Sequence, residues 1–291
     1  MDQAVHAAAR QCLHSGEAAI VVEVIAAQGS VPREAGTRML VCTDRAIGTV
    51  GGGHLEWKAV QHAREMLRTG ECTPRSEHYP LGPALGQCCG GAVTLGFSLL
   101  DQSVMSSWAA RPPLFHLQLY GAGHVGRAVA TLLAMLDVRV DWIDEREQEF
   151  PATTALGSAW PAHVRRVCVD AVEAEVDSAP PGAFFLVLTH QHDLDLRITE
   201  AILKRGDFGF LGLIGSRTKR QRFLHRFEAR GISPDSIAKM VCPIGIEGIA
   251  GKEPEVIAVA AVAQLLQARG SQHAASRERN EIFPHASTRS G

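Results

Sequence analysis

The stretch Gly121-Ala-Gly-His-Val-Gly126 decides the fold of the second half of this 291-residue chain. It follows an apolar segment at 115–120, and the residues after it are apolar at spacings of three and four, as on one face of a helix. Each glycine has its own expected role. Gly121 permits a tight turn, Gly123 lets a phosphate approach the backbone, and Gly126 lets the helix pack closely against the strand.

The next apolar segment, 138–143, ends in Asp144, about 20 residues beyond the glycines, where dinucleotide-binding folds place an acid for a ribose hydroxyl or another diol. The helix start offers free N–H groups and a partial positive charge to a phosphate. Strand, glycine turn, helix, strand and acid together predict a Rossmann-like unit with a parallel sheet. The candidate cofactor-binding residues are Gly121, Gly123, His124, Gly126 and Asp144.

A buried strand at 183–188 is followed by Thr189-His-Gln-His-Asp-Leu-Asp195, and ligands bind at this end of the strands in open parallel sheets. The spacing of His190 and His192 admits a metal site. Leu194 and Asp195, however, stand where the H-x-H-x-D-H motif of metallo-hydrolases has Asp and His. The other interpretation is a polar loop that lines the ligand crevice or caps a helix starting near Asp195.

A further strand, 208–214, leads into a basic helix. Ser216 is expected to cap this helix, and Arg217 or Lys219 to approach an anion at its start. The same basic residues also fit a solvated face, so both interpretations stay open for Lys219, Arg220 and Arg222.

The first half has shorter strands separated by glycine-rich turns, with helices expected at 1–15 and from Gly53 to a stop at Gly70. The fold class is therefore α/β, with an N-terminal α+β domain followed by a Rossmann-like parallel-sheet domain. We expect the first domain at 1–100, a linker at 101–113, the second domain at 114–269 and a disordered tail at 270–291.

Charge and composition exclude several classes of partner. The 29 Lys and Arg residues nearly balance the 31 Asp and Glu residues, whereas a general nucleic-acid or anionic-membrane binder is more basic. No signal peptide is expected, and no run approaches the roughly 20 apolar residues of a membrane span. Seven cysteines without framework spacing favour a reducing compartment, so the cytoplasm is the expected location.

Three glycine-bearing segments punctuate the first half, at 28–39, 48–56 and 86–91, and together they suggest a pocket. The last of them is GQCCGG. Its adjacent thiols, Cys88 and Cys89, are poor disulfide partners for each other and are expected to face something else. Among the other cysteines, Cys242 is of interest because it opens a glycine-rich loop, whereas Cys12, Cys42, Cys72 and Cys168 are expected to lack partners.

From about Glu17 to Leu266 the sequence resembles the XdhC/CoxI family. The resemblance rests on seven ordered segments: GSVPREAGTRM (29–39), GTVGGGHLE (48–56), GQCCGG (86–91), GAGHVGRA (121–128), THQHDLDL (189–196), GLIGSRTKRQRF (212–223) and CPIGIEGIAGKEP (242–254). It implies a chaperone that binds the molybdenum cofactor, assists its sulfuration together with a cysteine desulfurase, and inserts it into xanthine dehydrogenase. It also implies a homodimer that carries the cofactor rather than using it.

The resemblance gives the thiol pair a role. Because molybdenum is thiophilic, Cys88 and Cys89 are expected beside the bound cofactor, and Cys89 is the stronger candidate for a transient contact with the metal. We expect His190, His192, Ser216 and Arg217 to contribute to the same cofactor site. The alternative without a cofactor role is a tight turn with buried, unreactive thiols.

Two other functions fit parts of the sequence. The Rossmann-like unit alone fits an NAD(P)-dependent oxidoreductase, although the resemblance makes NAD(P) an improbable cofactor here. His190 and His192 alone fit a metal-dependent hydrolase.

Overall fold

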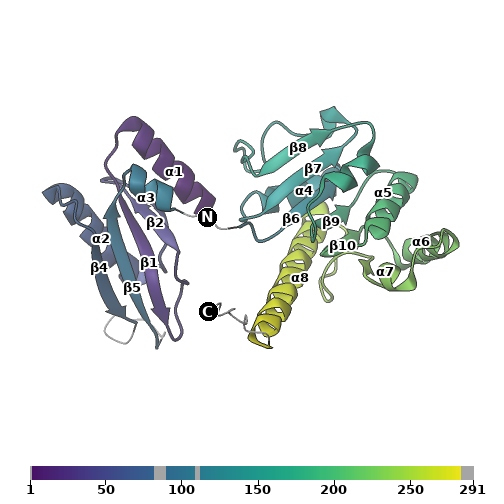
Figure 1. The fold of residues 1–291 in the computed structure, drawn as a ribbon. Helices are drawn as coiled ribbons and strands as arrows, with labels where there is room; N and C mark the ends of the chain where they lie inside the picture. The colour runs from purple at the N-terminus through teal and green to yellow at the C-terminus, as the bar shows by residue number, and fades with distance from the viewer. Residues whose placement is uncertain (1, 82–89, 109–111, 283–291) are drawn as a thin grey trace, which may run out of the picture. The chain divides into compact units, whose positions relative to one another are not determined.

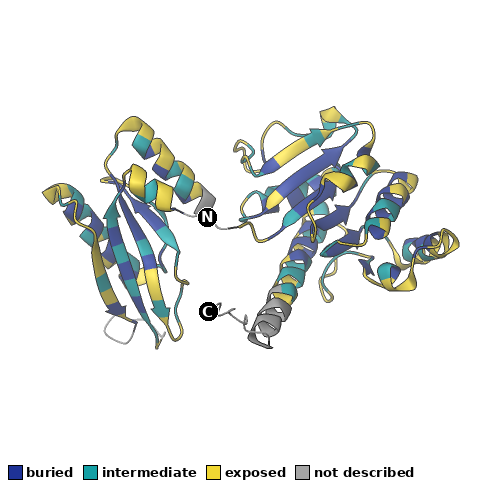
Figure 2. Ribbon diagram, in the orientation of Figure 1, coloured by how far each residue is buried: buried dark blue, intermediate teal, exposed yellow. Residues whose placement is uncertain are grey.

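The chain forms two compact units, each with its own sheet and helices (Figure 1). The computed structural model describes residues 2–81, 90–108 and 112–282. The first unit is Met1–Pro112 and the second is Pro113–Gly291. In both, the strands and the helices each contribute buried residues to the core (Figure 2).

The first unit is built on an antiparallel sheet with the strand order β3-β2-β1-β5-β4. Its elements in chain order are α1 (Asp2–Ser15), β1 (Ile20–Gln28), β2 (Arg38–Val41), β3 (Ala46–Gly48), α2 (Gly53–Thr69), β4 (Arg75–Pro80), β5 (Ala92–Leu99) and α3 (Gln102–Ser107).

Side chains alternate between the two faces of this sheet. On β1, Val22 and Val24 pack with α2, whereas Val21 packs with α1. The helix expected after Gly53 is confirmed, and it buries Leu55, Ala59, Ala63 and Met66. It ends at Gly70, which takes the left-handed conformation at φ 68° that favours glycine.

Two features of this unit differ from the expectation. The strand β4 was not expected, because its sequence RSEHYP is polar and only Tyr79 is buried, as befits an edge strand. The stretch 101–113 was expected to be a linker, but it begins with α3. Asp101 caps this helix by accepting from Val104 N at 2.7 Å, and Trp108 is buried against the first unit.

The second unit contains a parallel sheet with the order β11-β10-β9-β6-β7-β8. Strands β6, β7 and β8 proceed to one edge, and β9, β10 and β11 to the other, so the order reverses between β6 and β9. Its strands are β6 (His116–Tyr120), β7 (Arg139–Asp144), β8 (Val164–Cys168), β9 (Phe184–Val187), β10 (Phe210–Leu213) and β11 (Met240–Val241).

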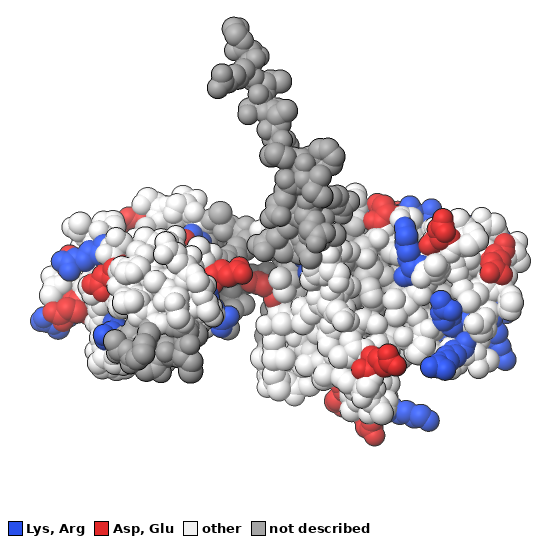
Figure 3. Space-filling model, turned by 90° about the horizontal axis from the view of Figure 1, so that it is seen from below, with Lys and Arg blue, Asp and Glu red and all other residues white. Residues whose placement is uncertain are grey.

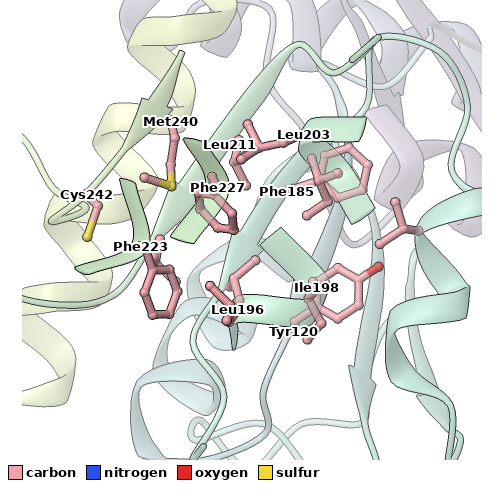
Figure 4. Packing of buried hydrophobic residues seen from close by; sticks show 14 of the residues in the cluster. Tyr120, Phe185, Leu196, Ile198, Leu203, Leu211, Phe223, Phe227, Met240 and Cys242 are labelled. Atoms are coloured by element: carbon pink, nitrogen blue, oxygen red, sulfur yellow. The ribbon is translucent and has the colours of Figure 1, made fainter. Parts of the chain in front are cut away.

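Helices cover both faces of this parallel sheet. They are α4 (His124–Leu133), α5 (His192–Arg205), α6 (Arg217–Ala229), α7 (Pro234–Ala238) and α8 (Pro254–Ile282), with short 3-10 helices η2 (Glu147–Glu149) and η3 (Val172–Ser178). Helices α4 and α8 share one core with the sheet. Helices α5, α6, α7 and η3 share the other, where Tyr120, Phe185, Ile198 and Phe227 pack (Figure 4).

Helix α8 continues to Ile282, whereas disorder was expected from Gly270 onward. Two side chains tie this part of the helix to the sheet domain. Arg269 Nε donates to Leu114 O at 2.5 Å, and Gln272 Nε2 donates to Gly209 O at 2.8 Å. These polar anchors stabilise a helix end that lacks a periodic apolar face. No helix in the described parts of the chain is long and apolar enough to cross a membrane.

Candidate ligand crevice at the carboxyl edge of the parallel sheet

The predicted site residues of the second unit lie at the carboxyl ends of neighbouring strands, in the loops that follow and in the first turns of the next helices. The glycine turn follows β6, and the segment 189–195 follows β9, so these two loops flank the point where the strand order reverses. The loop at 214–216 follows β10 beside them. Open parallel sheets bind their ligands at this position.

Gly121 and Gly126 lie in the tight turn and the close helix–strand contact that were predicted for them, whereas the phosphate contact of Gly123 stays a prediction. Gly121 has φ 115°, and a Cβ there would lie 2.3 Å from Leu188 O. A Cβ on Gly126 would lie 2.0 Å from Gly121 O, which is the close approach of helix and strand. Gly123, in contrast, has no neighbour within 4 Å of such a Cβ. Its surroundings are open, so a ligand can approach the backbone there.

Asp144 is at the predicted place, but its carboxylate already has partners. Oδ2 accepts from Ala122 N at 2.6 Å, and Arg146 donates to both oxygens, from Nε at 2.9 Å and Nη2 at 3.0 Å. Burial raises the pKa of Asp144, but these hydrogen bonds outweigh burial and lower it below its usual range. The carboxylate therefore holds the glycine turn against β7 and is not free to receive a ribose hydroxyl.

The segment after β9 is organised by Asp195. Its Oδ1 accepts from Thr189 N at 2.9 Å and Thr189 Oγ1 at 2.7 Å, which closes the loop at the start of α5. Its Oδ2 accepts from Lys219 Nζ at 2.5 Å, and the ammonium also donates to Ile214 O at 2.8 Å. Asp195 and Lys219 are both buried. The sequence placed Lys219 either near an anion or on a solvated face, and the structure instead pairs it with Asp195.

A cavity of about 230 Å³ opens between these loops, lined by His190, His192, Ser216 and Lys219 among others. A second cavity of about 230 Å³ shares His192, Ser216 and Lys219 and extends to Arg222 and Arg226. Ser216 caps α6 as predicted, accepting from Lys219 N at 3.2 Å. Arg217 is exposed at the first position of α6. Basic side chains and a helix start therefore adjoin the crevice, an arrangement that suits an anionic group.

In the described parts of the chain, no third metal-ligating side chain lies close to both His190 and His192. His190 Nε2 lies 2.9 Å from Gln191 Nε2 and 3.6 Å from Glu145 Oε1. Among the described residues, neither His190 nor His192 belongs to a group of three close His, Cys, Asp or Glu donors. Their position fits the other interpretation, a polar loop lining a ligand crevice.

Cys242 lies in the core. Its side chain packs in the cluster that contains Met240 and Phe223 (Figure 4) and is 7% exposed. Burial raises the pKa of its thiol, and the charge of Lys219 only partly opposes this. Cys242 was of interest because it opens a glycine-rich loop, but its burial gives no support for a functional role of the thiol.

Described parts of the glycine-bearing loops of the first unit lie close together, and the pocket that they suggest stays a prediction. A Cβ on Gly91 would lie 2.4 Å from both Gln28 O and Ser30 O, and a Cβ on Gly51 would lie 2.5 Å from Pro32 Cγ. Leu81 N donates to Gly91 O at 2.8 Å, which joins the ends of β4 and β5. Cys88 and Cys89 lie outside the described residues.

A larger cavity, about 530 Å³, was not foreseen from the sequence. Its walls come from α4, the segment 151–155 and the first turns of α8, and His124 is among its lining residues. Because these segments lie far apart in the sequence, no local sequence pattern indicates that they line one cavity. His124, predicted as a cofactor ligand, thus borders this cavity beside the open space at Gly123.

Comparison with known proteins assigns the chain to a family. Residues 117–265 match the model of the XdhC Rossmann domain, and residues 2–80 match that of the XdhC and CoxI family. This chain belongs to the XdhC/CoxI family. The assignment confirms both the resemblance and the Rossmann-like fold, because the matched ranges cover strands β1 to β4 of the antiparallel sheet and, from residue 117 on, the parallel sheet.

Two Escherichia coli proteins that are similar to this chain differ in length. YqeB is 30% identical over 86% of this chain, which spans only 43% of that protein. The molybdenum cofactor insertion chaperone PaoD is 24% identical, with 89% of this chain and 86% of PaoD covered. A crystal structure from Bacillus halodurans, described as a xanthine dehydrogenase, has a TM-score of 0.73 at 18% identity. It covers 92% of this chain and 96% of its own, which shows the same fold.

Proposed function

We propose that this chain is a chaperone that takes up the molybdenum cofactor as cargo and inserts it into a molybdoenzyme. The observation that carries the proposal is the similarity to the insertion chaperone PaoD over most of both chains. The crevice of the parallel-sheet unit supports it, because its helix starts, histidines and basic residues suit the anionic phosphate of such a cargo.

Particular residues would hold the cargo. Gly123 and His124 offer an open approach to the start of α4, and His190, His192, Ser216 and Arg217 surround or adjoin the crevice at α6. The thiols of Cys88 and Cys89 would meet the molybdenum end, with Cys89 as the transient ligand, because thiolates are soft donors.

The client enzyme, the sulfur source and the oligomeric state are proposed from the resemblance to the family. We propose xanthine dehydrogenase as the client, a cysteine desulfurase as the source of the sulfido ligand, and a cytoplasmic homodimer as the working form. The alternative of an NAD(P)-dependent oxidoreductase has weaker support, because Arg146 and Ala122 N occupy the carboxylate of Asp144 that would bind a ribose.

A delivery assay tests the proposal. Cofactor-free xanthine dehydrogenase is incubated with molybdenum cofactor, with and without the purified chain, and xanthine oxidation is followed. We expect faster and more complete activation with the chain present, and a smaller effect with Cys89→Ser than with Cys72→Ser. Equal activation with and without the chain would contradict the role for this client. Tight NADH binding without any gain in activation would favour the oxidoreductase.

A further inference from the structure

Two cysteines that were expected to lack partners lie against each other in the first unit. Cys12 is in the last turn of α1 and Cys42 directly follows β2, and their Sγ atoms are 3.8 Å apart. Glu17, in the connection from α1 to β1, places Oε2 3.5 Å from Cys12 Sγ. The three donor atoms all lie within 4.8 Å of one another. Among the described residues, these three side chains are the group of potential metal ligands that the fold places so close together.

Two of these separations match the distances between ligand atoms in a tetrahedral zinc site. With Zn–S near 2.3 Å and Zn–O near 2.0 Å, two thiolates in tetrahedral coordination lie about 3.8 Å apart, and a thiolate and a carboxylate oxygen about 3.5 Å apart. The observed distances between Cys12 and Cys42 and between Cys12 and Glu17 agree with both values.

The backbone around the three donors is fixed by local hydrogen bonds. Glu17 N donates to Cys12 O at 2.9 Å, and Cys42 N donates to Arg45 O at 2.9 Å. Both thiols belong to a buried cluster that includes Val21, Leu40 and Trp108, and they are at most 1% exposed. The donors are thus held in place on a dry, apolar support.

A positively charged side chain, Arg45, already contacts this group. Arg45 Nη2 lies 2.6 Å from Glu17 Oε2 and 3.9 Å from Cys12 Sγ. The side chains of Arg45 and Glu17 are 45% and 34% exposed, so the group opens to solvent on their side. A metal ion can enter from there once the guanidinium swings away, and water can supply the fourth ligand.

We propose that Cys12, Glu17 and Cys42 form a binding site for Zn²⁺ or another thiophilic divalent cation, which joins α1 to the sheet. Binding replaces the two thiol protons, which pass to solvent, and no electron is transferred. The site is separate from the proposed cargo crevice, and its test does not depend on the molybdenum cofactor.

The test is titration of the reduced full chain with Co²⁺, followed by displacement with Zn²⁺, in a Cys88→Ser/Cys89→Ser background that removes the other thiol pair. We expect one Co²⁺ per chain with thiolate-to-metal absorption in the near ultraviolet. Cys12→Ala and Cys42→Ala should each weaken binding at least tenfold, and Cys72→Ala should leave it unchanged.

Arg45→Ala serves as the opposite control, because it changes an exposed side chain that competes with the cation. It should strengthen Co²⁺ binding several-fold, and Glu17→Gln should weaken it, even where a buried cysteine variant fails to fold. Absence of the absorption band, equal affinity in Arg45→Ala and Glu17→Gln, or a Cys12–Cys42 disulfide that excludes Co²⁺ under reducing conditions would overturn the proposal.

Discussion

Lys219 Nζ lies 2.5 Å from Asp195 Oδ2, and this buried ion pair joins the start of α6 to the start of α5. The two loops that it connects flank the cavity lined by His190, His192 and Ser216. The pair itself lines this cavity and links the two helix starts beside it. Basic and acidic side chains elsewhere are interspersed on the face of each unit seen in Figure 3.

Removing one member of this pair leaves the other charge buried without its counter-ion. We expect Lys219→Met to lower the free energy of unfolding by about 3 kcal/mol. Asp195→Asn/Lys219→Met should recover part of that loss, because neither charge remains. Urea unfolding of the unmodified chain and of these two variants measures this. A single variant as stable as the unmodified chain would show that the pair contributes nothing.

Two glycines of the 121–126 turn are expected to contribute differently, Gly121 to the stability of the fold and Gly123 to the approach of a ligand. Gly121→Ala forces a Cβ toward Leu188 O in a backbone region that favours glycine, and we expect it to cost about 1–3 kcal/mol of stability. Gly123→Ala should change stability by less than about 0.5 kcal/mol, since its Cβ meets open space. Thermal unfolding of both variants decides the point, and equal losses would refute the distinction.

Asp141 predicts a specific loss of stability in acid. Burial raises its pKa, but hydrogen bonds from His116 and Arg165, at 2.7 and 2.8 Å, outweigh burial and lower it to about 2 from 3.8. A lowered carboxyl pKa stabilises the fold above pH 3.8, and this contribution disappears as the pH falls toward 2.

We therefore expect Asp141→Asn to be about 2 kcal/mol less stable than the unmodified chain at pH 7, with a smaller difference at pH 3. Urea unfolding at the two pH values measures the difference, and Asp235→Asn, on the short helix α7, is the matched control. A difference that stays constant or grows in acid would contradict the sign.

Local signals were sufficient to predict the Rossmann-like unit. The glycine turn, the apolar strand before it and the helical periodicity after it are contiguous in sequence, and the structure confirms the strand, the turn and the helix. Contacts between distant residues were not predictable in this way. Lys219 and Asp195, or Cys12 and Cys42, meet only because the fold brings together segments that lie far apart in the sequence. The edge strand β4 and the end of α8 were missed because polar residues dominate both, and periodicity detects only elements with a buried apolar face.

The occupied carboxylate of Asp144 shows a second limit of sequence reasoning. Its place in the chain correctly predicts its place at the end of β7, but not that Arg146, two residues later, turns back and binds it. A sequence pattern can predict where a side chain lies in the fold. Whether its hydrogen-bonding groups are already occupied depends on which residues surround it in the structure.

The central claim is that the chain captures a molybdenum-bearing pterin, and its content of bound pterin tests this most directly. The protein is purified from a molybdenum-replete host, and the fluorescent oxidation product of the pterin is quantified per chain. We predict near-stoichiometric pterin in the unmodified chain and in Cys72→Ser, and at least a fivefold loss in Gly123→Val, whose fold should persist. A well-folded, unmodified chain that carries no pterin, under conditions where the host fills its molybdoenzymes, would contradict the account.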